Sequence, residues 1–521
     1  MHFKFYKAGL ASCLVILLAG SVLQMLFGVS YPERLSSSEW GLDDAYISYR
    51  YAENLVRGEG LVFNHGERVE GYSNFLYVLA VAPAFWLTDR DGVYFFSVLL
   101  NVLCALGALW LLNDHLRRNL GERAALAGSL LFALCLPLWA AVASGLETSL
   151  VLLISLGIWV CVERVAANPT RRNTLALAGL TVLSLLARVD GFLIPGIAIL
   201  YLVLKRRIRP ATVCALALLA TQGLYELWRW TYYSALLPTT YYVKVAGPML
   251  ARLSFAGSEL SNIAILEGLL PYLLILLLLA VEAVYRLYRR ESFLPSGFGT
   301  LLAPLWIAYW FYIGGDQLWD RFLVILFPLG IFALLSACEK ISSPRMAVYG
   351  LVLLATLQVG APCLTDLRFD FGFKRFDALI GTGKFLRERC PGRTLAVEAL
   401  GKMSFFSGLY AQDMLGLADP VIAHRPASGG TFVPGHLKFD PDYTLSRRPD
   451  IIAIGIFPNR DLARGLSRAK YEQAGYHLEY LVDTGRPAHP GPHIMEVGSL
   501  NESSVSRLIV DGFDLAIVVK D

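Results

Sequence analysis

The chain has 521 residues, of which 55% are hydrophobic and only 17% are charged, and its mean hydropathy is +0.52. Soluble domains carry about 25% charged residues, so this composition excludes a soluble globular protein and indicates an integral membrane protein. The net charge of +4 does not indicate nucleic-acid binding, because the basic residues stand in clusters between apolar runs, where they act as signals of membrane topology.

The first apolar run covers residues 8–29, close to the roughly 20 residues that a spanning helix needs. A cleaved signal peptide is the alternative, and LASC at residues 10–13 resembles a lipoprotein signal. Only a few apolar residues precede Cys13, however, whereas signal peptides have an apolar core of about 7–15 residues. We therefore expect an uncleaved first helix.

Further apolar runs lie near 93–113, 124–143, 148–162, 173–187, 191–204, 211–229, 264–284, 298–313, 322–337 and 346–362. Clusters of Arg and Lys stand at every second connection between them, which is the positive-inside pattern. With a cytoplasmic N-terminus, this pattern predicts about eleven membrane spans. Residues 75–87 are too short to cross a bilayer at about 1.5 Å per residue, so we expect a helix lying in the interface there.

The predicted topology places the remaining polar stretches on the extracytoplasmic face: 30–92, SGLE at 144–147, RVDG at 188–191, 230–262, GGDQLWDR at 314–321 and the tail from 363. Ionisable residues at membrane depth are costly and usually line a polar cavity. A structural ion pair is the alternative, and Arg188 with Asp190 is the obvious local pair. Several polar insertions on one face favour a shared site.

The tail differs in composition from the rest of the chain. The short apolar pieces TLAVEAL, DIIAIGIF, HIMEV and LAIVV alternate with polar helical stretches such as 374–389, which predicts a mixed α/β domain. We therefore predict a membrane core over 1–362, with a catalytic first loop at 30–92, and an extracytoplasmic domain over 363–521. Cys363 and Cys390 lie on the oxidising side and can form a disulfide there, although their geometry is open.

We expect this domain to cover the mouth of the active site and to bind the acceptor without taking part in bond formation. Sugar stacking and hydrogen bonding are the roles predicted for five tail residues: Phe405, Phe406, Tyr410, His424 and His436. A structural role is the alternative for each histidine, and their spacing does not suggest a metal site.

The first loop contains DDAYISYRYAENLVRGEGLVFNHGERVEGYSN at 43–74, which opens with two adjacent aspartates. The chain has no Walker or kinase motif, and nucleotide sugars are generally lacking outside the cytoplasm, so an activated lipid must deliver the transferred group. We expect Asp43 or Asp44 to deprotonate an acceptor hydroxyl. The alternative is structural, with Asp44 as the N-cap of a helix over 45–57.

A lipid-phosphate donor also needs cations that hold its phosphate. The residues predicted for this role are Lys244, Arg321, Arg188 and Arg50. Lys244 and Arg321 can alternatively anchor lipid headgroups. The residues predicted to bind the sugar or the acceptor are Glu70, Tyr72, Asn74, Glu147, Tyr241, Tyr242 and Asp316. The alternative for Glu147 is a charge that opens the helix at 148.

Five segments carry a family resemblance: DDAYISYRYAENLVRGEGLVFNHGERVEGYSNFLYVL at 43–79, LLPTTYYVK at 236–244, GGDQLWDRFLVILFP at 314–328, FSGLYAQDMLGLADPVIAHRP at 406–426 and GHLKFDPDYTLSRRPDII at 435–452. They resemble the C-type (GT-C) polyprenyl-phosphate glycosyltransferases, and most of all the branch of mycobacterial arabinofuranosyltransferase B and the Pseudomonas pilin arabinosyltransferase. The family motif usually has Asn where this chain has Thr240.

The resemblance implies a polytopic α-helical membrane protein with an extracytoplasmic C-terminal domain, located in a bacterial inner membrane. It implies an inverting pentosyltransferase whose donor is polyprenyl-phosphoryl arabinofuranose and whose acceptor is a cell-wall glycan or a pilin-like protein. It implies no nucleotide, and often no metal, so we expect no required cofactor; the alternative is a divalent cation held by Asp43 and Asp44. The acid that opens the first-loop motif acts as the base in the wider superfamily, which points to Asp43, with Asp44 in support. A transporter of lipid-linked sugars is the alternative, although the repeated halves typical of transporters are absent.

Overall fold

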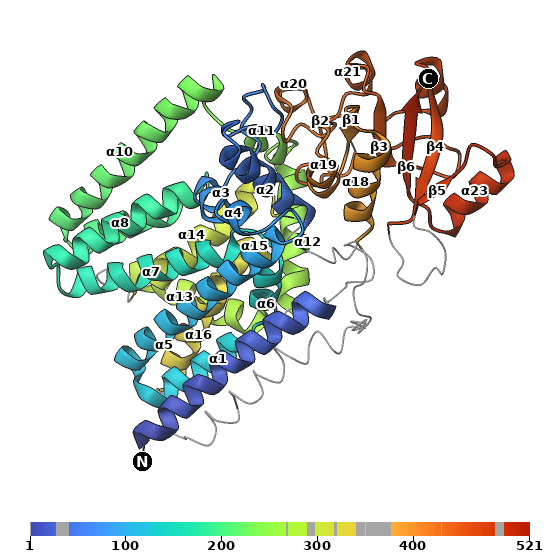
Figure 1. Ribbon diagram of the computed structural model, residues 1–521. Coiled ribbons are helices and arrows are strands. Elements are labelled where there is room, and N and C mark those ends of the chain that lie inside the picture. The colour runs from blue at the N-terminus through green and yellow to red at the C-terminus, as the bar shows by residue number, and fades with distance from the viewer. Residues whose placement is uncertain are drawn as a thin grey trace.

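The computed structural model describes residues 2–27, 41–266, 269–288, 297–316, 320–339, 350, 377–428, 430–484 and 494–521. A bundle of long helices forms one part of the molecule and a sheet domain the other, and the first-loop helices lie between them (Figure 1). The helices up to residue 339 are α1 His2–Phe27, α2 Asp43–Val56, α3 Phe75–Val81, α4 Ala84–Leu87, α5 Val93–Ala133, α6 Leu136–Ala143, α7 Thr148–Ala167, α8 Arg171–Ala187, α9 Leu193–Leu204, α10 Ile208–Tyr233, α11 Thr239–Lys244, α12 Met249–Leu266, α13 Leu270–Tyr288, α14 Phe298–Ile313, α15 Asp320–Leu323 and α16 Leu326–Cys338.

The described helices confirm a multi-pass membrane protein. Four apolar stretches are long enough to cross a bilayer, namely Tyr6–Met25, Val93–Ala133, Thr148–Ala167 and Ile208–Tyr233, and shorter apolar helices lie beside them. A straight helix as long as α5 would measure about 60 Å, twice a bilayer core. Gly121 interrupts α5 with a φ of 84°, which separates the two runs that the sequence predicts there. The run at 346–362 lies outside the described residues apart from Gly350, so the total of eleven spans stays a prediction.

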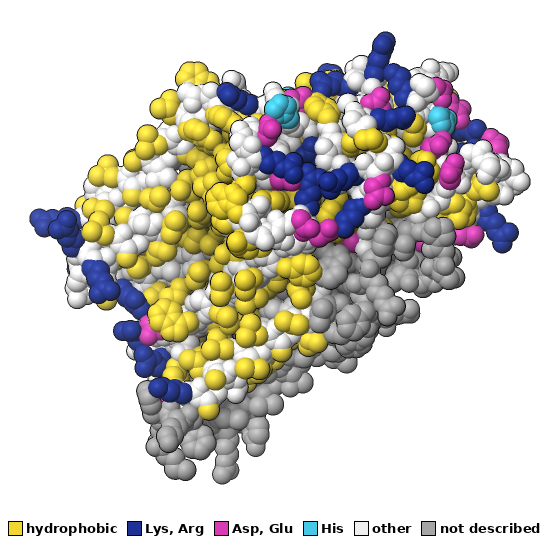
Figure 2. All heavy atoms as spheres, in the orientation of Figure 1, with side chains coloured by type: hydrophobic (Ala, Val, Ile, Leu, Met, Phe, Trp, Pro, Cys, Tyr) yellow, Lys and Arg dark blue, Asp and Glu magenta, His cyan; other side chains and the backbone are white. Residues whose placement is uncertain are grey.

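The surface of the bundle is arranged as a membrane protein requires. Figure 2 shows hydrophobic side chains over a broad face of the helices. Lys and Arg side chains gather at the edge farthest from the sheet domain, near the ends of α8 and α10. This edge contains basic clusters of the positive-inside pattern, and the sheet domain lies at the other end of the bundle. The extracytoplasmic location of that domain stays a prediction.

The C-terminal domain contains a six-stranded sheet in the order β2-β1-β3-β6-β4-β5. Strand β1 is parallel to β2 and β3, and the remaining pairs are antiparallel. Its elements are α18 Ala378–Arg389, β1 Thr394–Val397, α19 Lys402–Ser407, β2 Tyr410–Asp413, α20 Pro420–Ala423, α21 Pro441–Ser446, β3 Ile451–Gly455, α22 Arg468–Gln473, β4 Tyr476–Val482, β5 Ile494–Glu496, α23 Glu502–Asp511 and β6 Leu515–Lys520.

The sheet confirms the predicted mixed α/β domain. The four apolar pieces singled out in the sequence form β1, β3, β5 and β6. Two strands were not predicted: β2, which is short and polar, and β4, whose alternation is broken by a register shift between Leu478 and Tyr480. Of the two cysteines considered for a disulfide, Cys363 lies outside the described residues.

The first loop and the C-terminal sheet share one hydrophobic core. Tyr51 and Phe63 of the loop belong to the same buried cluster as Leu395, Val397 and Ile517 of the sheet. Phe63 is 1% exposed, and the other four are fully buried. The C-terminal domain is therefore packed against the loop that carries the paired aspartates.

We expect Phe63→Ala to destabilise the C-terminal domain, although the two are far apart in the sequence. Removing a buried Phe side chain costs about 3–5 kcal/mol, through lost burial and the cavity left behind. Thermal melting in detergent and tryptic cleavage within 377–521 measure the effect. Phe457→Ala is the matched control, because Phe457 is 53% exposed. Unchanged protection of the domain in Phe63→Ala would show that the two cores are independent.

Candidate active site

The two aspartates open helix α2, which begins at Asp43. The predicted capping role of Asp44 is wrong, because the N-cap residue is Leu42 and no side chain caps the helix. Negative charge in a first turn favours a helix, so the pair suits this position without any cap. Asp44 is left with a partly exposed carboxylate, whose Oδ2 lies 3.7 Å from the Nζ of Lys244.

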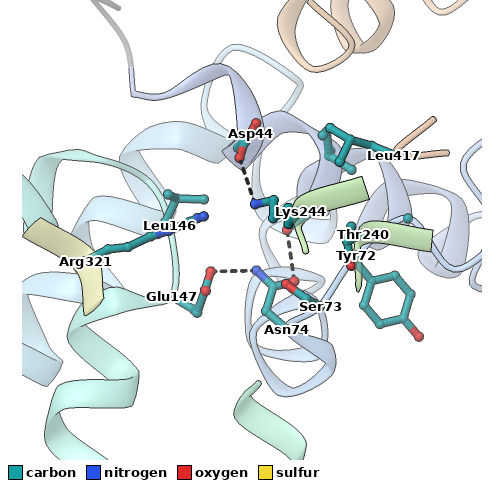
Figure 3. A pocket seen from close by; sticks show the side chains of 13 residues that line it. Asp44, Tyr72, Ser73, Asn74, Leu146, Glu147, Thr240, Lys244, Arg321 and Leu417 are labelled. Carbon is teal, nitrogen blue, oxygen red and sulfur yellow. Dashed lines mark hydrogen bonds and ion pairs between the residues drawn. The ribbon is translucent and has the colours of Figure 1, made fainter. Parts of the chain in front are cut away.

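Asp44 lies at the edge of an open pocket. Figure 3 shows side chains from the first loop, from α11 and from the region of Arg321 converging on it. The lining residues are Asp44, Ile47, Ser48, Gly71, Tyr72, Ser73, Asn74, Leu146, Glu147, Thr240, Lys244, Arg321 and Leu417. On α2, positions 44, 47 and 48 share one helix face, which explains why these three line the pocket together.

Two cationic side chains enter the pocket from different segments. Lys244 ends the short helix α11, one turn after Thr240, so that both reach the same side. Desolvation, followed by the positive charge of Arg321, lowers the pKa of Lys244. The guanidinium of Arg321 donates to Oδ2 of Asp316, and both side chains are more than nine-tenths buried. A pocket with two cations beside one partly exposed carboxylate is suited to an anionic ligand.

A buried ion network supports the pocket from behind. Glu147 accepts a hydrogen bond from Asn74 at 2.8 Å and another from Arg188 at 2.7 Å. Arg188 also binds Asp190, which accepts a hydrogen bond from Tyr309 at 2.8 Å. Burial raises the pKa of Glu147, but the charges of Arg188 and Arg321 outweigh it, so the net shift is downward. Glu147 is therefore held as a carboxylate at the pocket wall.

Part of the tail matches a known family model. Residues 373–492 match a family model described as a domain of unknown function, DUF8728. Over 245 residues the chain is 31% identical to a terminal β-(1→2)-arabinofuranosyltransferase of Mycobacterium tuberculosis. That match covers 44% of this chain and 38% of the relative, well under half of the relative's length.

Solved structures match over far more of the chain. An ArnT from Cupriavidus metallidurans bound to undecaprenyl phosphate has a TM-score of 0.58 at 11% identity, with 99% of this chain and 98% of that one covered. An Archaeoglobus fulgidus oligosaccharyltransferase has a TM-score of 0.52 at 12% identity, covering 90% and 72%. This chain has the GT-C fold. Its sequence resembles that of an arabinofuranosyltransferase.

Only some of the residues predicted to bind the donor phosphate line the pocket. Lys244 and Arg321 line the pocket, whereas Arg188 lies behind it and holds Glu147. The prediction for Arg50 is wrong for this structure, because its guanidinium is buried and donates to the carbonyls of Phe63, Ser404 and Leu409 at 2.6–2.7 Å. Arg50 connects the first loop to the C-terminal domain, and its guanidinium is not among the groups that line the pocket.

The residues predicted to bind the sugar or acceptor also divide into two groups. Tyr72, Asn74 and Glu147 line the pocket. Glu70, Tyr241, Tyr242 and Asp316 are not among its lining residues. Glu70 is paired with Arg229 at 2.6 Å, and Asp316 binds Arg321. Tyr242 packs against His424 with the two rings tilted and their centroids 4.3 Å apart. The role predicted for Glu70 is therefore wrong, because its carboxylate is buried against a cation of α10.

Five tail residues were predicted to stack on or hydrogen-bond to sugars, but two of them are buried in the protein. Phe405 and Phe406 are 0% and 3% exposed and pack against Tyr46 of α2, so the prediction of sugar stacking is wrong for both. Tyr410 donates a hydrogen bond to Glu67, and His436 lies beside the carbonyl of Pro434. The tail reaches the pocket instead through Leu417, which sequence reasoning missed.

Sequence reasoning also missed two hydroxyl-bearing residues of the pocket, Ser48 and Ser73, as binding groups, and it noted Thr240 only as a departure from the family motif. Helical spacing offered a signal for Ser48, because it lies four residues after Asp44 and so on the same face of the helix. In the structure its hydroxyl donates a hydrogen bond to Asn74 at 3.1 Å. Ser73 lies between two residues that were predicted. No local signal marked Leu417, whose place depends on how the tail folds.

A buried aspartate shapes the turn that carries Leu417. Asp413 accepts hydrogen bonds from the N–H groups of Leu415 and Ala418 at 2.8 and 2.6 Å. The carbonyl of Leu417 in turn lies within hydrogen-bonding distance of the Thr239 hydroxyl at the start of α11. Burial raises the pKa of Asp413 to about 6.

The raised pKa of Asp413 predicts a pH dependence of stability. The unfolded chain has a pKa of about 3.9 there, so the folded state binds more protons between roughly pH 4 and 6. This group therefore makes the protein less stable as pH rises through that window, by at most about 1.4 kcal/mol per pH unit. We expect the melting temperature of the wild type, minus that of Asp413→Asn, to fall between pH 4 and 6 and to level off above. Parallel melting curves would contradict this assignment.

Proposed function

We propose that this chain is a membrane glycosyltransferase that moves a pentose, D-arabinofuranose, from a polyprenyl-phosphate donor to a glycan or protein acceptor. The observation that carries the proposal is the pocket in which the Asp44 carboxylate faces Lys244 and which Arg321 also lines. The GT-C fold and the resemblance to an arabinofuranosyltransferase support it. The reaction takes place on the extracytoplasmic side of a bacterial inner membrane, with the N-terminus in the cytoplasm.

In the proposed reaction, Asp44 acts as the general base. The acceptor hydroxyl gives its proton to the Asp44 carboxylate while its oxygen forms a bond to the anomeric carbon of the sugar. The bond between that carbon and the phosphate oxygen breaks, and its electron pair leaves with the polyprenyl phosphate. Attack from the side opposite the phosphate inverts the anomeric centre.

Lys244 and Arg321 stabilise the departing phosphate. Preorganised cations are most effective where negative charge develops in the transition state. Both side chains reach the pocket, and Arg321 is fixed in place by Asp316. These two cations provide the charge that a metal ion supplies in other phosphate-transferring sites, so we propose that transfer proceeds without a metal or another cofactor.

Other polar residues of the pocket hold the sugar hydroxyls in this proposal. Asn74 and Glu147 are hydrogen-bonded to each other, and the Ser48 hydroxyl donates to Asn74. These groups are fixed by neighbours that are themselves bonded, which reduces the entropy lost when a sugar binds. The isoprenoid chain of the donor remains among the apolar helices of the bundle.

We expect Asp44→Asn to retain donor binding and to lose several orders of magnitude in turnover. The amide keeps the shape of the carboxylate but cannot take the acceptor proton. The measurement is transfer of radiolabelled arabinofuranose from its polyprenyl phosphate to candidate acceptors in purified membranes. Asp91→Asn is the control, because the side chain of Asp91 is 59% exposed. Wild-type turnover in Asp44→Asn would exclude it as the base.

We expect Lys244→Met and Arg321→Met to weaken donor binding, transition-state stabilisation or both. A hydrogen bond to a charged group contributes about 1.5–3 kcal/mol, or roughly 10- to 150-fold. The readouts are donor affinity and kcat with the lipid-linked sugar. Lys384→Met is the matched control on the domain surface, where Lys384 pairs with Asp91. If the double variant binds and transfers normally, both residues anchor lipid headgroups instead.

A further inference from the structure

The two adjacent aspartates have opposite surroundings. Asp44 lines the pocket, whereas Asp43 is not among its lining residues. Each carboxylate oxygen of Asp43 accepts a backbone N–H bond from the C-terminal domain, one from Gly401 at 2.8 Å and one from Lys402 at 2.7 Å. A carboxylate that accepts two such bonds holds α2 against the C-terminal domain, because its removal leaves both N–H donors without a partner.

Helix α2 presents a second face to the C-terminal domain. Residues 43, 46 and 50 are three and four positions apart and lie on one side of the helix. Tyr46 packs against Phe405 and Phe406 with ring centroids 5.6 Å away in both cases. The Arg50 guanidinium donates to the carbonyls of Ser404 and Leu409. All three therefore contact the segment around α19, while residues 44, 47 and 48 face the pocket.

The contact at Gly401 is so close that only glycine fits. A Cβ atom at this position would lie 1.8 Å from the backbone oxygen of Asp43. This is far inside van der Waals contact, and a backbone atom cannot move aside as a flexible side chain does. Any residue with a Cβ at 401 must push α2 away from the C-terminal domain.

We propose that Asp43 is a positioning residue that fastens α2 to the C-terminal domain, and that the domain thereby holds Asp44 within reach of Lys244 and the acceptor. This inference rests on the proposed function, in which Asp44 is the base. It gives the C-terminal domain a part in the bond-forming step, through the backbone of residues 401 and 402. It also gives the two adjacent aspartates different roles, with Asp44 as the base and Asp43 as the residue that positions α2.

Gly401→Ala provides the sharpest test, because it leaves both aspartates and every pocket residue unchanged. We expect kcat to fall about 10²-fold with little change in the KM for the donor, since a displacement of about 1 Å in a reacting group has an effect of this size. Gly498→Ala is the matched control in the same domain, because nothing lies within 4 Å of its added Cβ.

Asp43→Asn, alone and combined with Gly401→Ala, completes a double-mutant cycle. We expect a loss similar to that in Gly401→Ala, and a double variant no worse than the poorer single one, because both changes release the same contact. Hydrogen exchange of residues 45–56, measured without substrate, should be faster in Asp43→Asn and Gly401→Ala and unchanged in Asp44→Asn. Exchange needs no reaction, so faster exchange in these variants combined with no sugar transfer by the wild type would overturn the proposed function alone.

Two results would overturn the positioning role. The first is a loss of several orders of magnitude in Asp43→Asn while its hydrogen exchange stays native, since that pattern identifies Asp43 itself as the base. The second is native kcat together with native exchange in Gly401→Ala, since the close contact would then have no bearing on α2.

Discussion

The packing of α2 between the helix bundle and the C-terminal sheet fixes the geometry of the pocket. On the bundle side, the Tyr49 hydroxyl donates to the carbonyl of Gly145 at 2.9 Å. On the other side, Asp43 and Arg50 bind backbone groups of the C-terminal domain. A short helix contributes little stability of its own, so tertiary contacts on both flanks must hold it. The Asp44 carboxylate therefore reaches its position in the pocket only after both the helix bundle and the C-terminal domain have folded.

The charges around the pocket are arranged so that each buried one has an opposite partner. Arg321 pairs with Asp316, and Arg188 pairs with both Glu147 and Asp190. Breaking a buried pair leaves an uncompensated charge and is strongly destabilising, which keeps these side chains in fixed positions. The exception is the wider, partly exposed pair of Asp44 and Lys244 at 3.7 Å. In the proposed function, this looser pair leaves room for a phosphate and a hydroxyl to enter.

The C-terminal domain contributes directly to the architecture of the pocket. Its strands share a core with the first loop, and Leu417 supplies part of the pocket wall. The family model of unknown function matches this region, over 373–492. The contacts at Gly401, Lys402 and Leu417 connect that domain to the pocket of a GT-C core.

The sequence by itself determined the membrane class, the mixed α/β tail and the segments that carry the pocket, because hydropathy, strand-like alternation and polar insertions are local properties of the chain. It also predicted Asp44, Lys244, Arg321, Asn74 and Glu147 as site residues, all of which line one pocket. It assigned Asp43, Arg50 and Glu70 to the same site, but each of them is bound to a distant part of the chain. Charged residues have the same appearance in a sequence whether they face a cavity or a partner, and only the tertiary structure decides which of the two they meet.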